Sequence, residues 1–191
     1  MMSLELLAEP LPGLKIIRAP RHTDARGFFQ ETFHEDAYRQ LGIEPSFVQD
    51  NWSRSTRGTV RGLHYQLRKP QAKLIQVVSG EVFDVAVDIR RGSPTYGTSH
   101  MIQLSGAEAV QVYIPEGYAH GFCVVSEQAD LMYKCTDFYH ADDNYGIHWD
   151  DPDLSIEWPP VIDQPTLSDK DLTHPKLRDV DPACLPVFET S

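Results

Sequence analysis

The chain has 191 residues, of which 41% are hydrophobic, and these values are typical of a soluble globular protein with a well-filled core. Its formal net charge of −11 argues against general affinity for nucleic acids or membranes, which basic surfaces provide. There is no apolar run of about 18 residues, and the segment MMSLELLAEPLPG has neither the basic nor the sustained apolar region of a signal peptide, so we expect a cytoplasmic protein.

One domain is predicted, with helix and turn signals at its two ends. A short helix is expected from His34 to Leu41, and it ends at Gly42 as glycine-capped helices do. Five prolines between Pro152 and Pro175 predict a wrapping tail of turns and short helices rather than a second domain. The domain over residues 1–191 is therefore divided into an N-terminal arm of strands with the short helix (1–47), a barrel core (48–149) and a C-terminal tail (150–191).

Alternation of residues predicts a series of β-strands in the core. The clearest is EVFDVAVDI, residues 81–89, in which one face is expected to pack and the other, with Asp84 and Asp88, is polar. Ser-Gly at 79–80 separates this strand from the apolar run 74–78, a pattern that predicts a hairpin. Such spacing indicates a sandwich or barrel, with further strands expected at residues 99–104, 109–114, 120–125 and 130–137.

The three cysteines are Cys123, Cys135 and Cys184, with no C-x2-C spacing between them. The first two fall within expected strands. Free cysteine commonly packs as a small hydrophobic residue, so we expect buried, reduced thiols rather than a redox or metal role.

Two stretches keep the spacing of the metal-binding motifs of cupins but not all of their ligands. The stretch GTVRGLHYQLRKPQAKLIQVVSG, residues 58–80, follows the pattern G-x5-H-x-H, then Glu, six residues and Gly. His64 takes the place of the first His, whereas Gln66 and Lys73 replace the second His and the Glu. The second motif, P-x-G-x2-H-x3-N, keeps His120 but not its Asn.

Loss of these ligands predicts a cupin without its metal. Lysine at neutral pH is a protonated donor with no lone pair, and transition metals need several His, Cys or carboxylate ligands that converge. The predicted fold class is all-β, a cupin-type jelly-roll barrel or sandwich with a few short helices and the wrapping tail. Its pocket, with two histidines, a lysine and neighbouring arginine, suits an anion and proton transfer.

Four further strings complete the pattern: DARGFFQETF at 24–33, VQDNWSRSTRGTVRGLHYQ at 48–66, YKCTDFY at 133–139 and SDKD at 168–171. In this order and spacing, and along nearly the full chain, they resemble the nucleotide-sugar epimerases that act on 4-keto-6-deoxyhexoses, typified by the dTDP-4-dehydrorhamnose 3,5-epimerases. The resemblance implies an isomerase that inverts C3 and C5 of dTDP-4-dehydro-6-deoxy-D-glucose to give dTDP-4-dehydro-L-rhamnose. No cofactor and no metal are expected.

The resemblance implies that four residues carry the reaction. His64 is the base, since removal of a proton next to a ketone needs a pKa near neutrality, and Asp171 fixes its tautomer. Lys73 holds the charge that develops on the ketone oxygen, and Tyr133 returns a proton from the opposite face of the ring. Each of these roles has a purely structural alternative: a structural histidine, a helix-capping aspartate, a solvated lysine and a packing tyrosine, respectively, for His64, Asp171, Lys73 and Tyr133.

Other residues are implied to bind the nucleotide sugar. Arginines pair with phosphate and aromatic rings stack on a base, as is expected of Tyr139 near thymine. In the family the DARGFF strand reaches the neighbouring subunit's site, which implies a homodimer; a surface ion pair is the alternative for Arg26 and Glu31. The implied contacts are Arg26, Phe29, Glu31, Gln49, Asn51, Arg61, His120, Tyr139, Asn144 and Lys170.

The sequence departs from the family pattern at one position, and three other functions remain open. Asn144 stands where many relatives carry a glutamate, so that contact departs from the family pattern. The chain is also compatible with a monofunctional 3- or 5-epimerase of a related sugar nucleotide. A non-catalytic cupin that binds sugar nucleotides is a further alternative, as is a metal-dependent cupin oxygenase or isomerase, for which only His64 and His120 remain as ligands.

Overall fold

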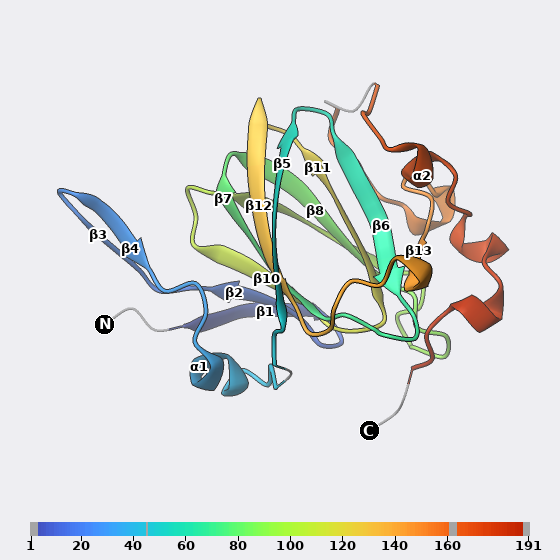
Figure 1. Cartoon of the computed structure of the whole chain (residues 1–191), viewed down its shortest axis with the longest axis horizontal. Coiled ribbons are helices and arrows are strands. Elements are labelled where there is room, and N and C mark those ends of the chain that lie inside the picture. The colour runs from blue at the N-terminus through green and yellow to red at the C-terminus, as the bar shows by residue number, and fades with distance from the viewer. Residues whose placement is uncertain (1–3, 45, 161–163, 189–191) are drawn as a thin grey trace.

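Two antiparallel sheets form the framework of the protein in the computed structural model (Figure 1), which describes residues 4–44, 46–160 and 164–188. The ends of the predicted domain, residues 1 and 191, lie outside the described residues. The strands are β1 Glu5–Leu11, β2 Leu14–Arg18, β3 Arg21–Asp24, β4 Gly27–Gln30, β5 Gln49–Thr56, β6 Val60–Gln66, β7 Lys73–Ser79, β8 Glu81–Asp88, β9 Ser99–Ser105, β10 Val110–Ile114, β11 Tyr118–Val124, β12 Gln128–Cys135 and β13 Asn144–Gly146. The helices are α1 Glu35–Arg39 and α2 Asp169–Leu172, with 3₁₀ turns η1 Ala141–Asp143, η2 Pro152–Leu154, η4 Leu177–Asp179 and η5 Pro182–Cys184.

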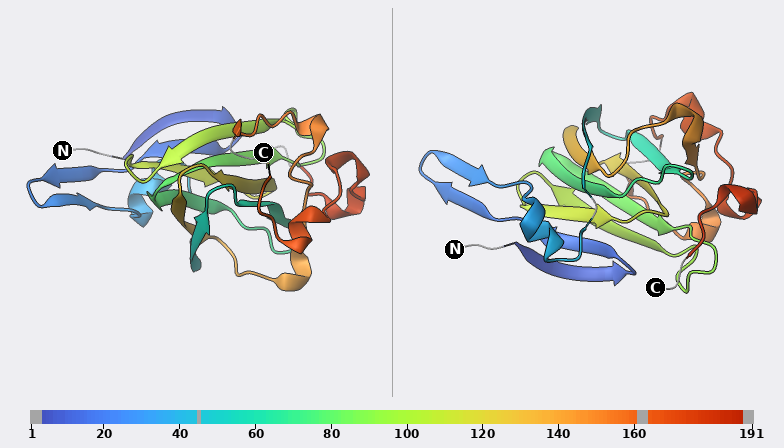
Figure 2. Two further views of the ribbon diagram at one scale, coloured as in Figure 1. Left: turned by 90° about the horizontal axis from the view of Figure 1, so that it is seen from above. Right: turned by 60° about the horizontal axis from the view of Figure 1, so that its bottom comes forward.

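The strands are divided between two sheets and one separate hairpin. One sheet has the order β1-β2-β10-β7-β12-β5, and the other has the order β13-β6-β11-β8-β9. The β3–β4 hairpin, called the arm below, projects away from the sandwich on the side opposite the C-terminal tail (Figure 2). The predicted all-β fold with few short helices is confirmed, and none of the described helices has the length and apolar character needed to span a bilayer.

The main core lies between the two sheets. Leu14, Ile75 and Leu131 of the six-stranded sheet are almost fully buried against residues such as Val82 and Leu104 of the five-stranded sheet. Burial of these side chains removes apolar surface from water, which is the main favourable contribution to folding. The packed layer holds the two sheets apart in a fixed geometry, and the cavity described below opens at one end of it.

β8 is covered on both of its faces. Val85 and Val87 pack outward, as the alternation predicted, against a second cluster that the C-terminal tail supplies through residues such as Leu177. The opposite face is polar, as expected, but it is buried as well: Asp84 is 1% exposed and Asp88 is fully buried. Buried carboxylates need partners, and both have them in this fold.

The turn at 79–80 connects the two sheets and does not form the predicted hairpin. β7 pairs with β10 and β12, whereas β8 pairs with β11 and β9. Gly80 has a φ of +76°, and a Cβ there would lie 2.1 Å from the carbonyl oxygen of Gln128, so only glycine fits this crossing. The hairpin prediction was wrong because a Ser-Gly pair marks a change of direction without specifying which strand becomes the partner.

The other predicted elements are present with small shifts at their ends. β9, β10, β11 and β12 correspond to the four further strands, and α1 is followed by Gly42 in the left-handed region, at a φ of +74°. Cys123 and Cys135 are buried and Cys184 is half-buried, and all three thiols are free.

The C-terminal tail wraps the outer face of the five-stranded sheet, as predicted (Figure 2). A parallel bridge between Thr59 and Thr166 ties the tail to the start of β6. The backbone N–H of Val60 donates to the oxygen of Thr166 at 3.0 Å, and that of Thr166 donates to Gly58 at 2.9 Å. This attachment brings α2 alongside β6.

Candidate active site

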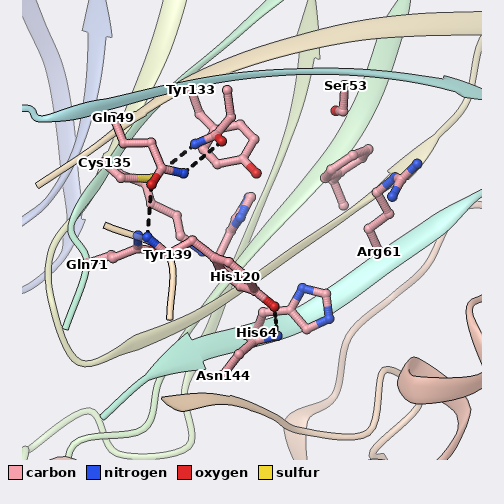
Figure 3. Close-up of a pocket in the computed structure, with 13 residues that line it drawn as sticks. Gln49, Ser53, Arg61, His64, Gln71, His120, Tyr133, Cys135, Tyr139 and Asn144 are labelled. Atoms are coloured by element: carbon pink, nitrogen blue, oxygen red, sulfur yellow. Dashed lines mark hydrogen bonds between the residues drawn. The ribbon is translucent and has the colours of Figure 1, made fainter. Parts of the chain in front are cut away.

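A cavity of about 370 Å³ opens between the two sheets. Its wall combines β5, β7 and β12 of one sheet with β6 and β11 of the other. His64 and Tyr133 lie on opposite sides of it (Figure 3). The lining residues are Gln49, Asn51, Ser53, Arg61, His64, Gln71, Lys73, His120, Phe122, Tyr133, Cys135, Tyr139 and Asn144.

His64 on β6 is paired with Asp171 on α2. The distance between His64 Nε2 and Asp171 Oδ1 is 2.5 Å, and the aspartate side chain is 6% exposed. Burial lowers the pKa of His64, while the contact with Asp171 opposes this effect. Burial alone would raise the pKa of Asp171, but the imidazoles of His174 and His64 outweigh it and hold that pKa well below its usual range. At neutral pH the pair is therefore a neutral imidazole beside an ionised carboxylate.

Lys73 and Tyr133 enter the cavity from neighbouring strands of the six-stranded sheet. Burial lowers the pKa of the Lys73 ammonium, against the opposing influence of Cys135 and Asp84. Burial also raises the pKa of Tyr133. Within the described residues, no hydrogen bond involves the Lys73 side chain, so its charge remains available to a group in the cavity. The tyrosine keeps its proton over a wide pH range.

The two remaining cupin-motif positions have different surroundings. His120 pairs with His64 across β11 and β6, and its Nε2 lies 2.8 Å from the buried Asp84 carboxylate. Gln66 does not line the cavity. Its amide nitrogen donates to the Lys69 carbonyl at 2.7 Å, and its amide oxygen accepts from the backbone N–H of His140 at 2.8 Å. Gln66, which replaces the second motif histidine, thus connects the chain segments at Lys69 and His140 through hydrogen bonds.

Six of the residues implied in nucleotide-sugar binding lie in the cavity wall: Gln49, Asn51, Arg61, His120, Tyr139 and Asn144. Gln49 donates to Asn51 at 2.9 Å and accepts from the backbone N–H of Tyr139 at the same distance (Figure 3). The Tyr139 ring is 54% exposed, so a face of it is open to stacking. Asn144, at the position that departs from the family pattern, donates to the Tyr139 hydroxyl at 3.4 Å.

Lys170 lies in an adjoining hollow of about 610 Å³ that shares Arg61, His64 and Asn144 with the cavity. Its ammonium donates to the Asn144 carbonyl at 3.2 Å. The adjoining hollow extends the site along the tail and leaves Lys170 within the same connected region.

The arm residues Arg26, Phe29 and Glu31 do not line the cavity of their own chain. Arg26 is bound to Asp24 on the arm at 2.6 Å, with a side chain that is 90% exposed. Phe29 is 71% exposed. The structure therefore does not bring these three residues together with His64: Arg26 and Phe29 lie on the projecting hairpin, and Glu31 directly follows β4.

Comparison with known proteins identifies the family. The family model described as dTDP-4-dehydrorhamnose 3,5-epimerase matches residues 8–179. The chain belongs to the dTDP-4-dehydrorhamnose 3,5-epimerase family. The epimerase of that name from Methanothermobacter thermautotrophicus is 46% identical over 180 residues, which cover 94% of this chain and 97% of the relative.

Solved structures of epimerases share the fold. The dTDP-6-deoxy-D-glucose-3,5-epimerase of Legionella pneumophila, solved in complex with dTDP-4-keto-L-rhamnose, is 47% identical with a TM-score of 0.95, over 98% of this chain and 100% of that chain. A 3'-monoepimerase from Streptomyces bikiniensis, in complex with dTDP-quinovose, is 34% identical with a TM-score of 0.86, over 92% and 89% of the two chains. The predicted cupin-type fold and the predicted family are confirmed.

Several residues of this epimerase-family site were not expected from the sequence. Ser53, Gln71, Phe122 and Cys135 also line the cavity. A signal for Ser53 existed, because it continues the alternation of Gln49 and Asn51 on one face of β5. Its hydroxyl is buried, and it has no hydrogen-bond partner among the described groups.

Proposed function

We propose that this protein inverts C3 and C5 of dTDP-4-dehydro-6-deoxy-D-glucose and produces dTDP-4-dehydro-L-rhamnose. The observation that carries the proposal is the His64–Asp171 pair, which faces Tyr133 across a cavity that also contains Lys73. The likeness to the Legionella enzyme, solved with dTDP-4-keto-L-rhamnose, supports this choice of sugar nucleotide.

His64 acts as the base. The 4-ketone acidifies the C–H bonds at both neighbouring carbons, and a neutral imidazole accepts one of these protons at neutral pH. The lowered pKa of His64 keeps it unprotonated before the reaction. Once it is protonated, the Asp171 carboxylate stabilises the imidazolium and holds the ring in one orientation.

Lys73 and Tyr133 complete the reaction. Removal of the proton places negative charge on the ketone oxygen, and the buried Lys73 ammonium stabilises that enolate. Tyr133 then donates its phenolic proton to the opposite face of the same carbon, which inverts the centre. His64 then releases its proton to solvent and Tyr133 takes one up from solvent, so both residues return to their starting state and each inverted carbon carries a hydrogen derived from solvent.

The proposed assembly is a homodimer in which each arm completes the neighbouring site. The projecting arm with its exposed Phe29 and the surface position of Arg26 support this arrangement, because neither reaches the cavity of its own chain. In the partner's site, Arg26 would pair with the diphosphate and Phe29 would stack on the base, with Glu31 beside them. The proposed location is cytoplasmic, in keeping with the three free thiols.

Incubation with dTDP-4-dehydro-6-deoxy-D-glucose in deuterated water tests the proposed reaction. We expect deuterium at both C3 and C5 of the product, with both centres inverted. Deuterium and inversion at only one carbon would instead identify a monofunctional epimerase. The structural likeness to the Streptomyces 3'-monoepimerase is the observation that favours this alternative. If neither C3 nor C5 exchanges its hydrogen, the result would favour the non-catalytic binding protein.

A further inference from the structure

His174 lies beside the His64–Asp171 pair but does not line the cavity. It borders a separate hollow of about 350 Å³ under the C-terminal tail. Its side chain is 9% exposed, and its Nε2 atom is buried without a hydrogen-bond partner among the described groups. That atom is 3.6 Å from Oδ1 of Asp171, slightly beyond hydrogen-bond distance. A buried imidazole nitrogen without a partner lowers stability, so its position calls for an explanation.

The fold holds the His174 ring close to the pair. The rings of His174 and His64 meet edge to face, with their centroids 5.7 Å apart and their planes at 76°. Gly146 is opposite His64 in the β13–β6 register, and a Cβ at Gly146 would lie 2.3 Å from His174 Nε2. The carbonyl of Pro175 accepts from the N–H of His148 at 2.8 Å, which anchors the segment. The absence of a side chain at position 146 thus makes room for this imidazole.

The three side chains have the composition of a metal site but the spacing of an acid–base group. Their donor atoms lie within 4.8 Å of one another. Two ligands of a tetrahedral zinc ion, each about 2.1 Å from the metal, are separated by about 3.4 Å. The 2.5 Å between His64 and Asp171 is instead the length of a charge-assisted hydrogen bond.

We propose that His174 is a positioning residue that controls the basicity of His64 through Asp171, an inference that rests on the proposed role of His64 as the base. A small shift of the His174 ring lets Nε2–H donate to the same carboxylate oxygen that contacts His64. The carboxylate is then shared between two imidazoles and is a weaker acceptor for the His64 proton. His64 consequently stays neutral, and therefore active as a base, to lower pH.

The sign of the effect is the same in both charge states of His174. A neutral His174 reduces the basicity of Asp171 by donating to it, and a protonated His174 adds direct repulsion of the His64 imidazolium. Removal of His174 therefore raises the pKa of His64 in either case. The other titratable and charged groups near the two rings are Lys73, His120, Arg61, Tyr133, Tyr139 and Cys135 on the cavity side, and Lys170, Asp179, Asp181, Tyr65, Tyr145 and Cys184 around the hollow under the tail.

The test compares His174→Phe, which keeps a ring but no donor, with His174→Gln, which keeps a donor near the Nε2 position. The His64 pKa is measured by NMR of its imidazole in EDTA without substrate, so the result does not depend on turnover. We expect His174→Phe to raise this pKa by about 0.5 to 1 unit, and His174→Gln to restore most of the wild-type value. The acid limb of kcat/KM for the sugar nucleotide should move to higher pH by the same amount in His174→Phe, with kcat/KM reduced about 3- to 10-fold at pH values well below the wild-type limb and KM little changed.

An unchanged His64 pKa in a folded His174→Phe protein would overturn the inference, as would equal shifts in the two variants. If the phenylalanine variant does not fold, the comparison of His174→Met with His174→Gln decides the question by the same criterion. A wild-type protein that does not turn over the sugar nucleotide would refute the proposed function. The NMR titration would still decide whether His174 controls His64.

Discussion

At the scale of single residues, burial shifts the pKa values of the three residues proposed to act on the sugar around the reacting carbon. Burial lowers the pKa of His64 and of Lys73, whereas it raises the pKa of Tyr133. The proposed proton transfer to and from carbon requires a neutral base, a cation and a protonated phenol in the same cavity near neutral pH.

These shifts predict the two limbs of the pH profile. The base must be unprotonated, so the acid limb of kcat/KM should lie below pH 6.5, the ordinary pKa of histidine. Lys73 must be charged and Tyr133 protonated. Because the Lys73 pKa falls below 10.5 while that of Tyr133 rises above 10.0, the alkaline limb should belong to the lysine. Stopped assays over the pH range measure both limbs.

Lys73→Met should reduce kcat about 100-fold or more, since the enolate loses its cation, and the alkaline limb should move up to the pH at which Tyr133 ionises. Lys69→Met is the matched control, because Lys69 is exposed and does not line the cavity. An alkaline limb that stays at its wild-type pH in Lys73→Met would assign that limb to another group.

The sequence indicated some of the site residues, and others depend on tertiary contacts. His64 and Lys73 could be located because motif spacing fixes positions along two strands that are consecutive in the sequence. Asp171 is 107 positions from His64, and only the resemblance to a family joined the two. His174 was missed because its place depends on how the tail docks on β6 and on the space left at Gly146.

At the scale of elements, periodicity predicted the strands but not their partners. β8 was located by its alternation, yet its polar face is buried within the sandwich, where β11 places Phe122 opposite Asp84 and His120 Nε2 lies 2.8 Å from the Asp84 carboxylate. The 79–80 turn was predicted as a hairpin, yet the chain changes sheets there. Strand pairing is set by contacts between distant segments, which a local pattern does not contain.

Gly80→Ala tests the crossing between the sheets. Its left-handed φ disfavours a side chain, and the new Cβ would collide with the backbone of Gln128, so we expect a loss of about 2 to 4 kcal/mol in the free energy of unfolding. Gly92→Ala is the control, because Gly92 has a φ of +84° with open space around it and should lose only about 1 kcal/mol. Denaturant unfolding measures both. Equal losses would show that the close approach at Gly80 is unimportant.

At the scale of the whole molecule, the account requires two chains for each complete site. The cavity contains the proposed acid and base, whereas the arm that carries Arg26 and Phe29 does not line it and projects away from the sandwich (Figure 1). If the barrel of one chain and the arm of its partner form each site, an inactive barrel variant and an inactive arm variant should complement each other, whereas two barrel variants should not.

Mixing His64→Asn with the arm variant Arg26→Ala/Phe29→Ala should restore activity. In the mixed dimer, one site combines an intact barrel with an intact arm, so subunit exchange should return about a quarter of wild-type activity. The control pairs His64→Asn with Tyr133→Phe, whose lesions both lie in the barrel, and no complete site forms there. Recovery that is equal in the two mixtures, or absent from both, would contradict the shared site.

The most direct test of the two-faced proton transfer is the Tyr133→Phe variant in deuterated water. The ring keeps its packing, while the proton donor to the second face is lost. His64 still removes a proton and returns a deuteron to the same face, so we predict deuterium at C3 or C5 with retained configuration, read from NMR ring couplings beside the deuterium content at each carbon. Inversion of both centres at the wild-type rate would contradict the account and remove Tyr133 from its proposed role.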